Sequence, residues 1–332
     1  MPSMDIFNND AFSTVSLSAA IGDTPYVPQR LAELNLFSEE GMTTTSAMIE
    51  QLGTTLSLVP AGTRGAPANA TDRNKAKLIP FPSVHLPASE TVLADTIQNL
   101  RAFGSESELE TVQAVVNKQL TKMRRNLDAT IEYHRMGAIK GQVLDSDGTS
   151  VLLNLYTAFG VAQQTHNMAL TTSTTKVREQ IIKAKRKSED DLGGLMYRGM
   201  RAFCSPAFFD AFVGHTAVEA AFDRWMNGEF LRQDVRAGFY HGGVFWEEYR
   251  GAVGGVSFIT DGEAYLVPEG VPDMFITNYA PADYMEAVNT IGLPYYAKQE
   301  AMRMNKGVEL EAQSNPLCLN TRPRSVIKLT AS

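Results

Sequence analysis

One long amphipathic segment in the first half of the chain limits what the protein can fold into. Between residues 109 and 138, apolar residues recur in steps of three and four, while basic residues fall on other faces. This spacing predicts a single helix of roughly thirty residues, about 50 Å long. Ser105 and Glu108 form a capping-box pattern at its start, and Gly137 and Gly141 offer stop positions. The apolar positions are Leu109, Val112, Val116, Leu120, Met123, Leu127, Ile131 and Ala138.

The segment before this helix has little hydrophobic core of its own. Residues 1–53 are rich in Ser, Thr, Asp and Glu, with short helical patches near Val27–Leu36 and Thr43–Leu52. Seven acidic residues stand against Arg30 alone, so this arm is strongly acidic. We expect it to be ordered by a neighbouring subunit, through basic residues such as Lys118 to Arg125 and through burial of the apolar residues Ile6, Phe7, Phe12 and Leu17.

Residues 54–86 follow the pattern of a long hairpin. Thr54–Val59 and Leu78–Leu86 read as extended segments, and the turn-rich tip Ala61–Lys77 between them carries four basic side chains. Pro80 and Pro82 cannot donate hydrogen bonds to a central strand, which places the returning segment at an edge. A hairpin with so few apolar residues is marginal alone in water, so it requires another surface to lie on.

The remainder of the chain alternates short strands with helices. Strand character is expected over Gly141–Phe159 with a turn at Asp147-Gly148, followed by a basic helix over residues 174–191. A strand at Arg201–Cys204 leads into a helix capped by Ser205 and Pro206. The other expected elements are a helix near Ala217–Trp225, strands near Val244–Tyr249, Val256–Thr260, Tyr265–Val267 and Met274–Tyr279, and strands within Val308–Leu329.

Composition excludes several classes of protein. With 44% hydrophobic and 20% charged residues, the 332-residue chain is typical of a soluble globular protein of one or two domains. The net charge of -7 argues against a dedicated nucleic-acid binder. No Lys or Arg precedes Arg30, so no signal peptide is expected, and the uncharged run Gly148–Thr175 contains too many amide side chains for a membrane span.

No motif for catalysis, a cofactor or a metal stands out. The GxSxG, HExxH, phosphate-loop and GxGxxG patterns are missing. Cys204 and Cys318 have no metal-ligand spacing, and Cys204 reads as a buried inert thiol rather than a nucleophile. Asp190 and Asp191 fit a solvated helix end better than a metal site, and the basic run Lys176–Lys187 fits a partner-facing helix better than a nucleic-acid patch. The five histidines, interpreted as structural or surface residues, are His85, His134, His166, His215 and His241.

The order of these parts resembles a known family. An arm, an extended hairpin, a long spine helix, a mixed lobe and closing strands form the layout of lambda-like tailed-bacteriophage major capsid proteins, the major capsid protein E family, with the Hong Kong 97-type fold. The resemblance rests on three short stretches: Gly141-Gln142-Val143-Leu144-Asp145 after the helix, the Ser205-Pro206 unit leading to Phe222, and Ser314-Asn315-Pro316-Leu317-Cys318-Leu319 followed by Arg322-Pro323.

This resemblance implies an α+β fold with six consecutive regions. The long helix would belong to a peripheral domain that the end of the chain completes, and an axial domain would lie near the centre of the capsomer. The implied regions are the N-terminal arm 1–53, the extended loop 54–86 overlying an adjacent subunit, the peripheral domain 87–165, a connecting segment 166–189, the axial domain 190–295, and the closing peripheral strands 296–332.

The resemblance also implies a structural function in the virion. The chain would assemble in the host bacterial cytoplasm into hexamers and pentamers of an icosahedral head that encloses double-stranded DNA, without catalysis, cofactor or membrane. A separate scaffold protein and a portal would be partners, with a decoration protein as an optional addition. The net negative charge suits a shell that contacts packaged DNA non-specifically at most.

Two alternatives stay open at the level of sequence. An encapsulin-like shell that encloses a cargo would share the same fold, and genomic neighbours would separate it from a phage head. An enzyme would need a site assembled from distant residues such as His215, His241 and Asp261, for which the spacing gives no support.

Overall fold

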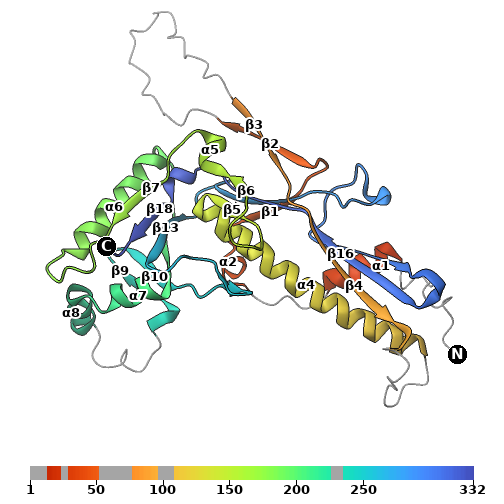
Figure 1. Ribbon diagram of the computed structural model, residues 1–332. Helices are drawn as coiled ribbons and strands as arrows, with labels where there is room; N and C mark the ends of the chain where they lie inside the picture. The colour runs from red at the N-terminus through yellow and green to blue at the C-terminus, as the bar shows by residue number, and fades with distance from the viewer. Residues whose placement is uncertain (1–12, 24–28, 52–76, 96–107, 226–234) are drawn as a thin grey trace, which may run out of the picture. The chain divides into compact units, whose positions relative to one another are not determined.

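The computed structural model describes residues 13–23, 29–51, 77–95, 108–225 and 235–332 (Figure 1). The chain forms two compact units, each of which combines distant stretches of sequence. The first unit contains residues 1–47, 81–134 and 276–318, and the second contains residues 48–80, 135–275 and 319–332. The expected segment Thr54–Val59, the tip Ala61–Lys77 apart from Lys77, and Ser105 lie outside the described residues.

The long amphipathic helix is confirmed as α4 (Glu108–Lys140), which has 33 residues. The expected stop at Gly137 is wrong, because the helix continues to Lys140 and only Gly141 adopts a left-handed conformation, with φ of 83°. Gly137 has a packing role instead. A Cβ there would come within 2.9 Å of both the carbonyl oxygen of Gln142 and the Cα of Val143, so only glycine lets the chain return this close to the helix.

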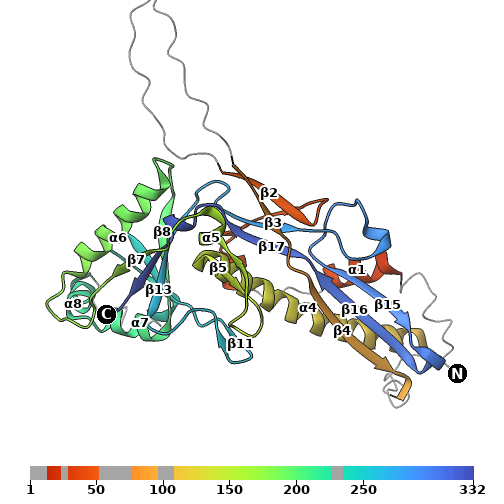
Figure 2. The same cartoon turned by 45° about the horizontal axis from the view of Figure 1, so that its top comes forward.

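In the first unit, α4 packs with one short helix and a three-stranded antiparallel sheet. The sheet has the order β15 (Tyr296–Ala301), β16 (Gly307–Ser314) and β4 (Leu86–Leu93), and the helix is α1 (Thr14–Asp23). Figure 2 shows β4, β16 and β15 side by side along α4. Their shared core contains Leu17, Ile21, Val92, Val116, Leu120, Met123, Leu127, Ala297, Val308, Leu310 and Ala312.

A second sheet of this unit brings the start of the chain beside its end. Strand β1 (Ser38–Gly41) runs parallel to β14 (Phe275–Tyr279), with Ser38 opposite Ile276 and Gly41 opposite Tyr279. Strand β17 (Pro316–Asn320) completes the order β1-β14-β17. Just before β1, the helix expected near Val27–Leu36 is confirmed only as the single turn α2 (Arg30–Glu33).

The expected helical patch Thr43–Leu52 is wrong. Residues Ser46–Gln51 form strand β2, which pairs with β3 (Lys77–Pro82) as the stem of a hairpin. Along β3 the side chains alternate, because Ile79 and Phe81 are buried while Leu78, Pro80 and Pro82 are not. The extended character of the returning segment is confirmed for residues up to Pro82. Its partner in the structure is Ser46–Gln51, whereas the expected partner Thr54–Val59 lies outside the described residues.

The second unit is built on a mixed six-stranded sheet. Its central strand pairs connect β13, β8 and β10, so that residues near 200, 246 and 266 lie beside one another. The closing strand expected near Leu329 is the second strand from one edge. In spatial order the strands are β7 (Gln164–Asn167), β18 (Ile327–Thr330), β13 (Glu263–Glu269), β8 (Gly199–Cys204), β10 (Val244–Glu248) and β9 (Phe239–His241).

Three helices accompany this sheet, and their boundaries follow the sequence signals. Helix α7 (Pro206–Val213) begins where Ser205 accepts a hydrogen bond from the Phe208 amide, with Pro206 at the first position. Its rings fill the core, since Phe212 stacks on Trp246 with centroids 4.1 Å apart. The other two are α6 (Val177–Leu192), closed by left-handed Gly193, and α8 (Thr216–Trp225).

Shorter elements connect these parts. The hairpin of β5 (Gln142–Leu144) and β6 (Val151–Asn154) confirms the expected turn, but the expected strand to Phe159 is wrong. The Asn154 side chain caps helix α5 (Leu155–Phe159) by accepting from the Thr157 amide, and this bond favours a helical turn. The remaining elements are β11 (Ala252–Val253), β12 (Val256–Ser257), and the 3-10 turns η4 (Val235–Ala237), η5 (Met285–Ala287), η6 (Arg303–Asn305) and η7 (Pro323–Ser325).

Candidate functional site

The residues proposed for a dispersed enzyme site are used in separate local structures. His215 lies between α7 and α8, where its Nε2 is 3.0 Å from the Thr172 carbonyl oxygen and its Nδ1 accepts from the Ala217 amide. His241 ends β9, half-buried and edge-on to the Phe212 ring. Asp261 lies in the turn before β13. None of the hydrogen bonds or ion pairs within the described residues joins these three side chains.

The other histidines are held in comparable ways. In the first unit, His85 Nδ1 lies 2.7 Å from Asn315 Oδ1, and His134 is buried within α4. In the second unit, burial lowers the pKa of His166 and of His241, with Lys187 adding to the effect at His166 and Arg178 at His241. Packed imidazoles with these contacts fit the structural interpretation of these residues.

The surroundings of Cys204 agree with an inert buried thiol, and Asp191 lies near a helix end as expected. Cys204 is fully buried in β8, and burial, reinforced by Glu247 and Glu248, raises the pKa of its thiol. Asp191 pairs with Arg324 at 3.1 Å near the end of α6. Across the described ranges, no group of three or more His, Cys, Asp or Glu side chains is arranged to hold a metal ion. Within the same ranges, no helix is long and apolar enough to cross a bilayer.

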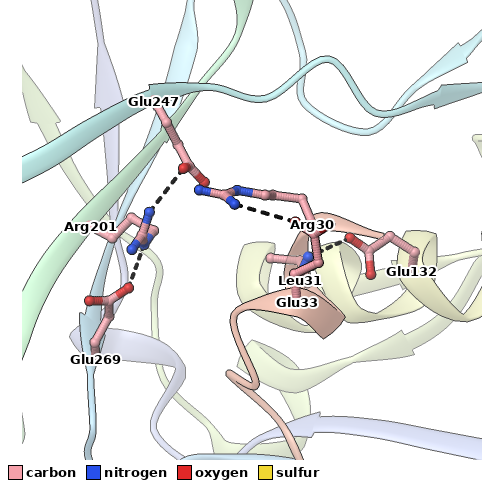
Figure 3. A network of polar contacts seen from close by, with 7 residues as sticks. All are labelled: Arg30, Leu31, Glu33, Glu132, Arg201, Glu247 and Glu269. Atoms are coloured by element: carbon pink, nitrogen blue, oxygen red, sulfur yellow. Dashed lines mark hydrogen bonds and ion pairs between the residues drawn. The ribbon is translucent and has the colours of Figure 1, made fainter. Parts of the chain in front are cut away.

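A charged cluster in the second unit is structural. Arg201 on β8 donates from Nη1 to Glu247 on β10 at 2.9 Å and from Nε to Glu269 on β13 (Figure 3). Its guanidinium carbon also lies 4.5 Å from the centroid of the Phe245 ring. One side chain therefore links the three central strands of the sheet, with its fixed planar donors used on two carboxylates.

The amino-terminal segment is partly built into its own subunit, which corrects the expectation for Leu17. Leu17 and Ile21 of α1 are 1% and 0% exposed, and both belong to the core around α4. The Ala297 amide donates to the Ser18 hydroxyl at 3.0 Å, and Arg124 donates to the Ile21 carbonyl. Residues 13–23 thus have a core within the chain, whereas Ile6, Phe7 and Phe12 lie outside the described residues.

The segment is also held at two later points. The Leu31 amide donates to Glu132 Oε1 at 2.7 Å, as Figure 3 shows. The Tyr279 hydroxyl donates to Glu39 at 3.1 Å, which adds a side-chain contact to the pairing of β1 with β14. Contact with the expected segment Lys118 to Arg125 is found at Arg124, but it is made within one chain and by a backbone carbonyl, that of Ile21.

Among the described residues, a close group of exposed apolar side chains lies in the first unit, between β14 and β15. Four large apolar side chains occupy nine residues there: Met285 is 89%, Val288 57%, Ile291 66% and Leu293 50% exposed. We call residues 285–293 the apolar loop. Contiguous exposed apolar side chains of this kind mark surfaces that another protein covers.

The apolar loop is anchored from beneath. The Gly292 amide donates to the Met42 carbonyl at 2.9 Å, and the Leu293 amide donates to the Tyr296 hydroxyl at 2.8 Å. Ala287 packs with Ala282, Tyr284 and Tyr296 in a small core cluster. Sequence reasoning missed this loop, although seven of the twelve residues between Pro281 and Pro294 are apolar, which was a usable signal.

Residues 13–331 match the family model described as phage major capsid protein E. The chain belongs to this family. Two phage proteins named major capsid protein are similar along nearly their full lengths. The one from Pseudomonas phage KPP10 is 28% identical over 318 residues, covering 89% of this chain and 90% of the relative. The one from Salmonella phage Felix O1 is 24% identical over 355 residues, covering 96% of each.

Solved structures agree on the fold of this capsid-family chain. The mature capsid protein of bacteriophage PhiM1 is similar with a TM-score of 0.52 and 13% identity, covering 93% of this chain and 89% of the other. The α+β fold of the Hong Kong 97 type, expected from the order of the parts, is thereby confirmed. A major capsid protein is a structural component of the virion, and its surfaces of interest are those that meet other subunits.

Proposed function

We propose that this major capsid protein assembles into hexamers and pentamers of an icosahedral head that encloses double-stranded DNA. The observation that carries the proposal is the apolar loop, which presents four exposed apolar side chains from a firmly anchored base. Burying such side chains against a neighbour would contribute about 25 cal/mol for each Å² removed from water. A preformed loop also loses little conformational entropy when it binds.

The hairpin stem supports the same proposal. Met48 on β2 and Leu78 on β3 are exposed large apolar residues, and Pro80 and Pro82 share the outward positions of β3. A two-stranded hairpin gains stability when one face is covered. We assign residues 54–86 to a loop that lies on an adjacent subunit.

The regional assignments from the sequence are kept as part of this proposal. Residues 87–165 and 296–332 would form the peripheral domain, residues 166–189 the connection, and residues 190–295 the axial domain near the capsomer centre, with residues 1–53 as the arm. Support for joining 87–165 with 296–332 comes from the first unit, in which β4 pairs with β16 and both share a core with α4.

Partners and location follow from the same function. A separate scaffold protein would guide assembly in the host cytoplasm, a portal would occupy one vertex, and a decoration protein would be an optional addition. Catalysis has no part in the proposal, because His215 and His85 make local hydrogen bonds and Cys204 is a fully buried thiol.

Assembly of paired variants tests the proposal. Met285→Ser with Ile291→Ser should leave the subunit folded, since both side chains are exposed, yet shift sedimentation from large particles toward free capsomers. Val253→Ser, at an exposed residue of β11, is the control and should assemble normally. A wild-type protein that stays monomeric with and without a scaffold would contradict the proposal. Particles that hold a protein cargo but no nuclease-protected DNA would favour the encapsulin-like alternative.

A further inference from the structure

Along the part of helix α4 whose side chains the structure describes, the exposed charged residues are all basic. From Ala114 to Lys140, where the structure describes the side chains, the exposed charged residues are Lys118, Lys122 and Arg125. The two acidic residues of this stretch, Asp128 and Glu132, are only 4% and 1% exposed. In a chain of net charge -7, residues 114–140 of this helix therefore bury both of their carboxylates and expose three cations.

The buried carboxylates are held by inward contacts. Asp128 lies 3.6 Å from Arg124 and accepts from the Tyr295 hydroxyl, while Glu132 accepts from the Leu31 amide. Neither carboxylate is placed to neutralise the outward cations. Lys122 has a carboxylate neighbour, Glu90 on β4, at 3.1 Å. Within the described part of the chain, Lys118 and Arg125 form no ion pair with any carboxylate.

These cations are spaced along one line and border a hollow. Steps of four and three residues separate them by about 6 Å and about 4.5 Å along the helix axis. The hollow has a volume of about 430 Å³ and is lined by Lys118, Thr121, Lys122, Arg125 and Asn126, which we call the α4 face. Lys118 and Arg125 bring charged donors to this lining and Asn126 brings an amide donor, whereas the Thr121 hydroxyl already donates to the Asn117 carbonyl. Charged donors of this kind suit an extended anion.

Helix α6 is the other basic element, and its charge is less uniform. Lys183 is paired with Glu179 at 2.9 Å, and Glu189, Asp190 and Asp191 follow in its last turn. A polyanion lying along α6 would meet carboxylates as well as cations. The α4 face offers its three cations over roughly 10 Å, a length of duplex DNA that carries about six phosphates.

We infer that the α4 face binds the phosphate backbone of double-stranded DNA, without sequence preference, and thus lies on the side of the shell that meets the packaged genome. The inference rests on the proposed function and adds a surface to it. Few cations per subunit make each contact weak and strongly dependent on salt. Many copies in one shell would together hold the genome at the shell surface although each contact is weak.

Salt-dependent binding tests the inference. The full-length wild type and the Lys118→Gln, Arg125→Gln double variant are titrated against a labelled DNA duplex over a range of KCl concentrations. The slope of log K against log salt is negative, and losing two phosphate contacts should make it less steep by about 2. The control, Lys176→Gln with Arg186→Gln, removes the same charge from exposed residues of α6 and should keep the wild-type slope. Thermal melting checks that all three proteins are folded.

Equal slopes for wild type and the α4 variant, or no binding of wild type even at low salt, would overturn the inference. A variant that keeps its DNA slope but loses binding to poly-glutamate would also overturn it, because the face would then serve an acidic protein segment. Sedimentation of the same samples is read separately. Failure of wild type to form particles contradicts the proposed function, whereas particles with an unaltered DNA slope contradict only the role of the α4 face.

Discussion

The backbones of Gly41 and Gly292 meet so closely that a Cβ on Gly41 would lie 2.3 Å from the Gly292 carbonyl oxygen. A Cβ on Gly292 would lie 2.0 Å from the carbonyl oxygen of Tyr279. This crossing supports the apolar loop where it passes the end of β1, and only a residue without a side chain fits on either side.

Gly292→Ala should therefore destabilise the subunit by about 1–3 kcal/mol, the usual cost of forcing extra atoms into a packed site. Urea unfolding of the purified protein measures the change. Gly199→Ala is the control, because its added Cβ would meet the nearest atom at 3.6 Å and should change stability little. Equal stability of the two variants would show that the crossing relaxes freely.

Arg201→Met should lower the free energy of unfolding by about 3–5 kcal/mol, because it removes the cation shared by Glu247 and Glu269 in the central sheet. Adding Glu247→Gln should recover part of this loss, since one buried carboxylate is then neutral. A double-mutant cycle from urea unfolding measures the coupling. Strictly additive effects would argue against a direct interaction.

Leu17→Ser should make residues 13–23 sensitive to protease in dissociated subunits, while the wild-type segment resists cutting. The reason is that Leu17 is buried in the subunit's own core, so its protection does not depend on a neighbour. Limited proteolysis with mass spectrometry locates the cuts. Val15→Ser, at an exposed position of the same helix, is the matched control. Rapid cutting of wild type within 13–23 would contradict the packing of α1.

Acid should weaken the second unit through two histidines. The pKa values of His166 and His241 lie below 6.5 in the folded protein because both are partly buried. The unfolded chain therefore binds protons first, and stability present above pH 6.5 is lost as pH falls through the lower folded values. The variant with His166→Gln and His241→Gln should show a smaller fall in Tm between pH 7 and pH 5. An unchanged fall would assign the acid sensitivity to other groups.

Local signals explain which parts of the fold were predictable. The apolar period of α4 and the Ser205-Pro206 cap of α7 depend on residues within a few positions of each other, and both predictions are confirmed. The helix predicted for residues 43–52 was wrong because strand pairing decides the structure there. The pairing of β2 with β3 outweighs a weak helical period in the sequence.

Predictions about function depended on contacts that no local pattern reveals. Leu17 was predicted to be buried by a neighbouring subunit. Its actual partners, in α4 and β16 of the same chain, lie about a hundred to nearly three hundred residues away in the sequence. The sequence shows that Lys118 and Arg125 lie on α4, but it does not show that Asp128 and Glu132 are buried. The net charge of the α4 face could therefore not be predicted. The order of elements, rather than any single motif, carried the correct family.

The parallel pairing of β1 with β14 has a consequence for biosynthesis. Glu39 contacts Tyr279, 240 residues later, and Ser18 contacts Ala297, 279 residues later. A ribosome adding about 5–20 residues per second therefore exposes α1 and β1 for many seconds before their partners emerge. A nascent chain that stops before these partners lacks the strands that cover α1 and pair with β1, so its first unit stays incomplete.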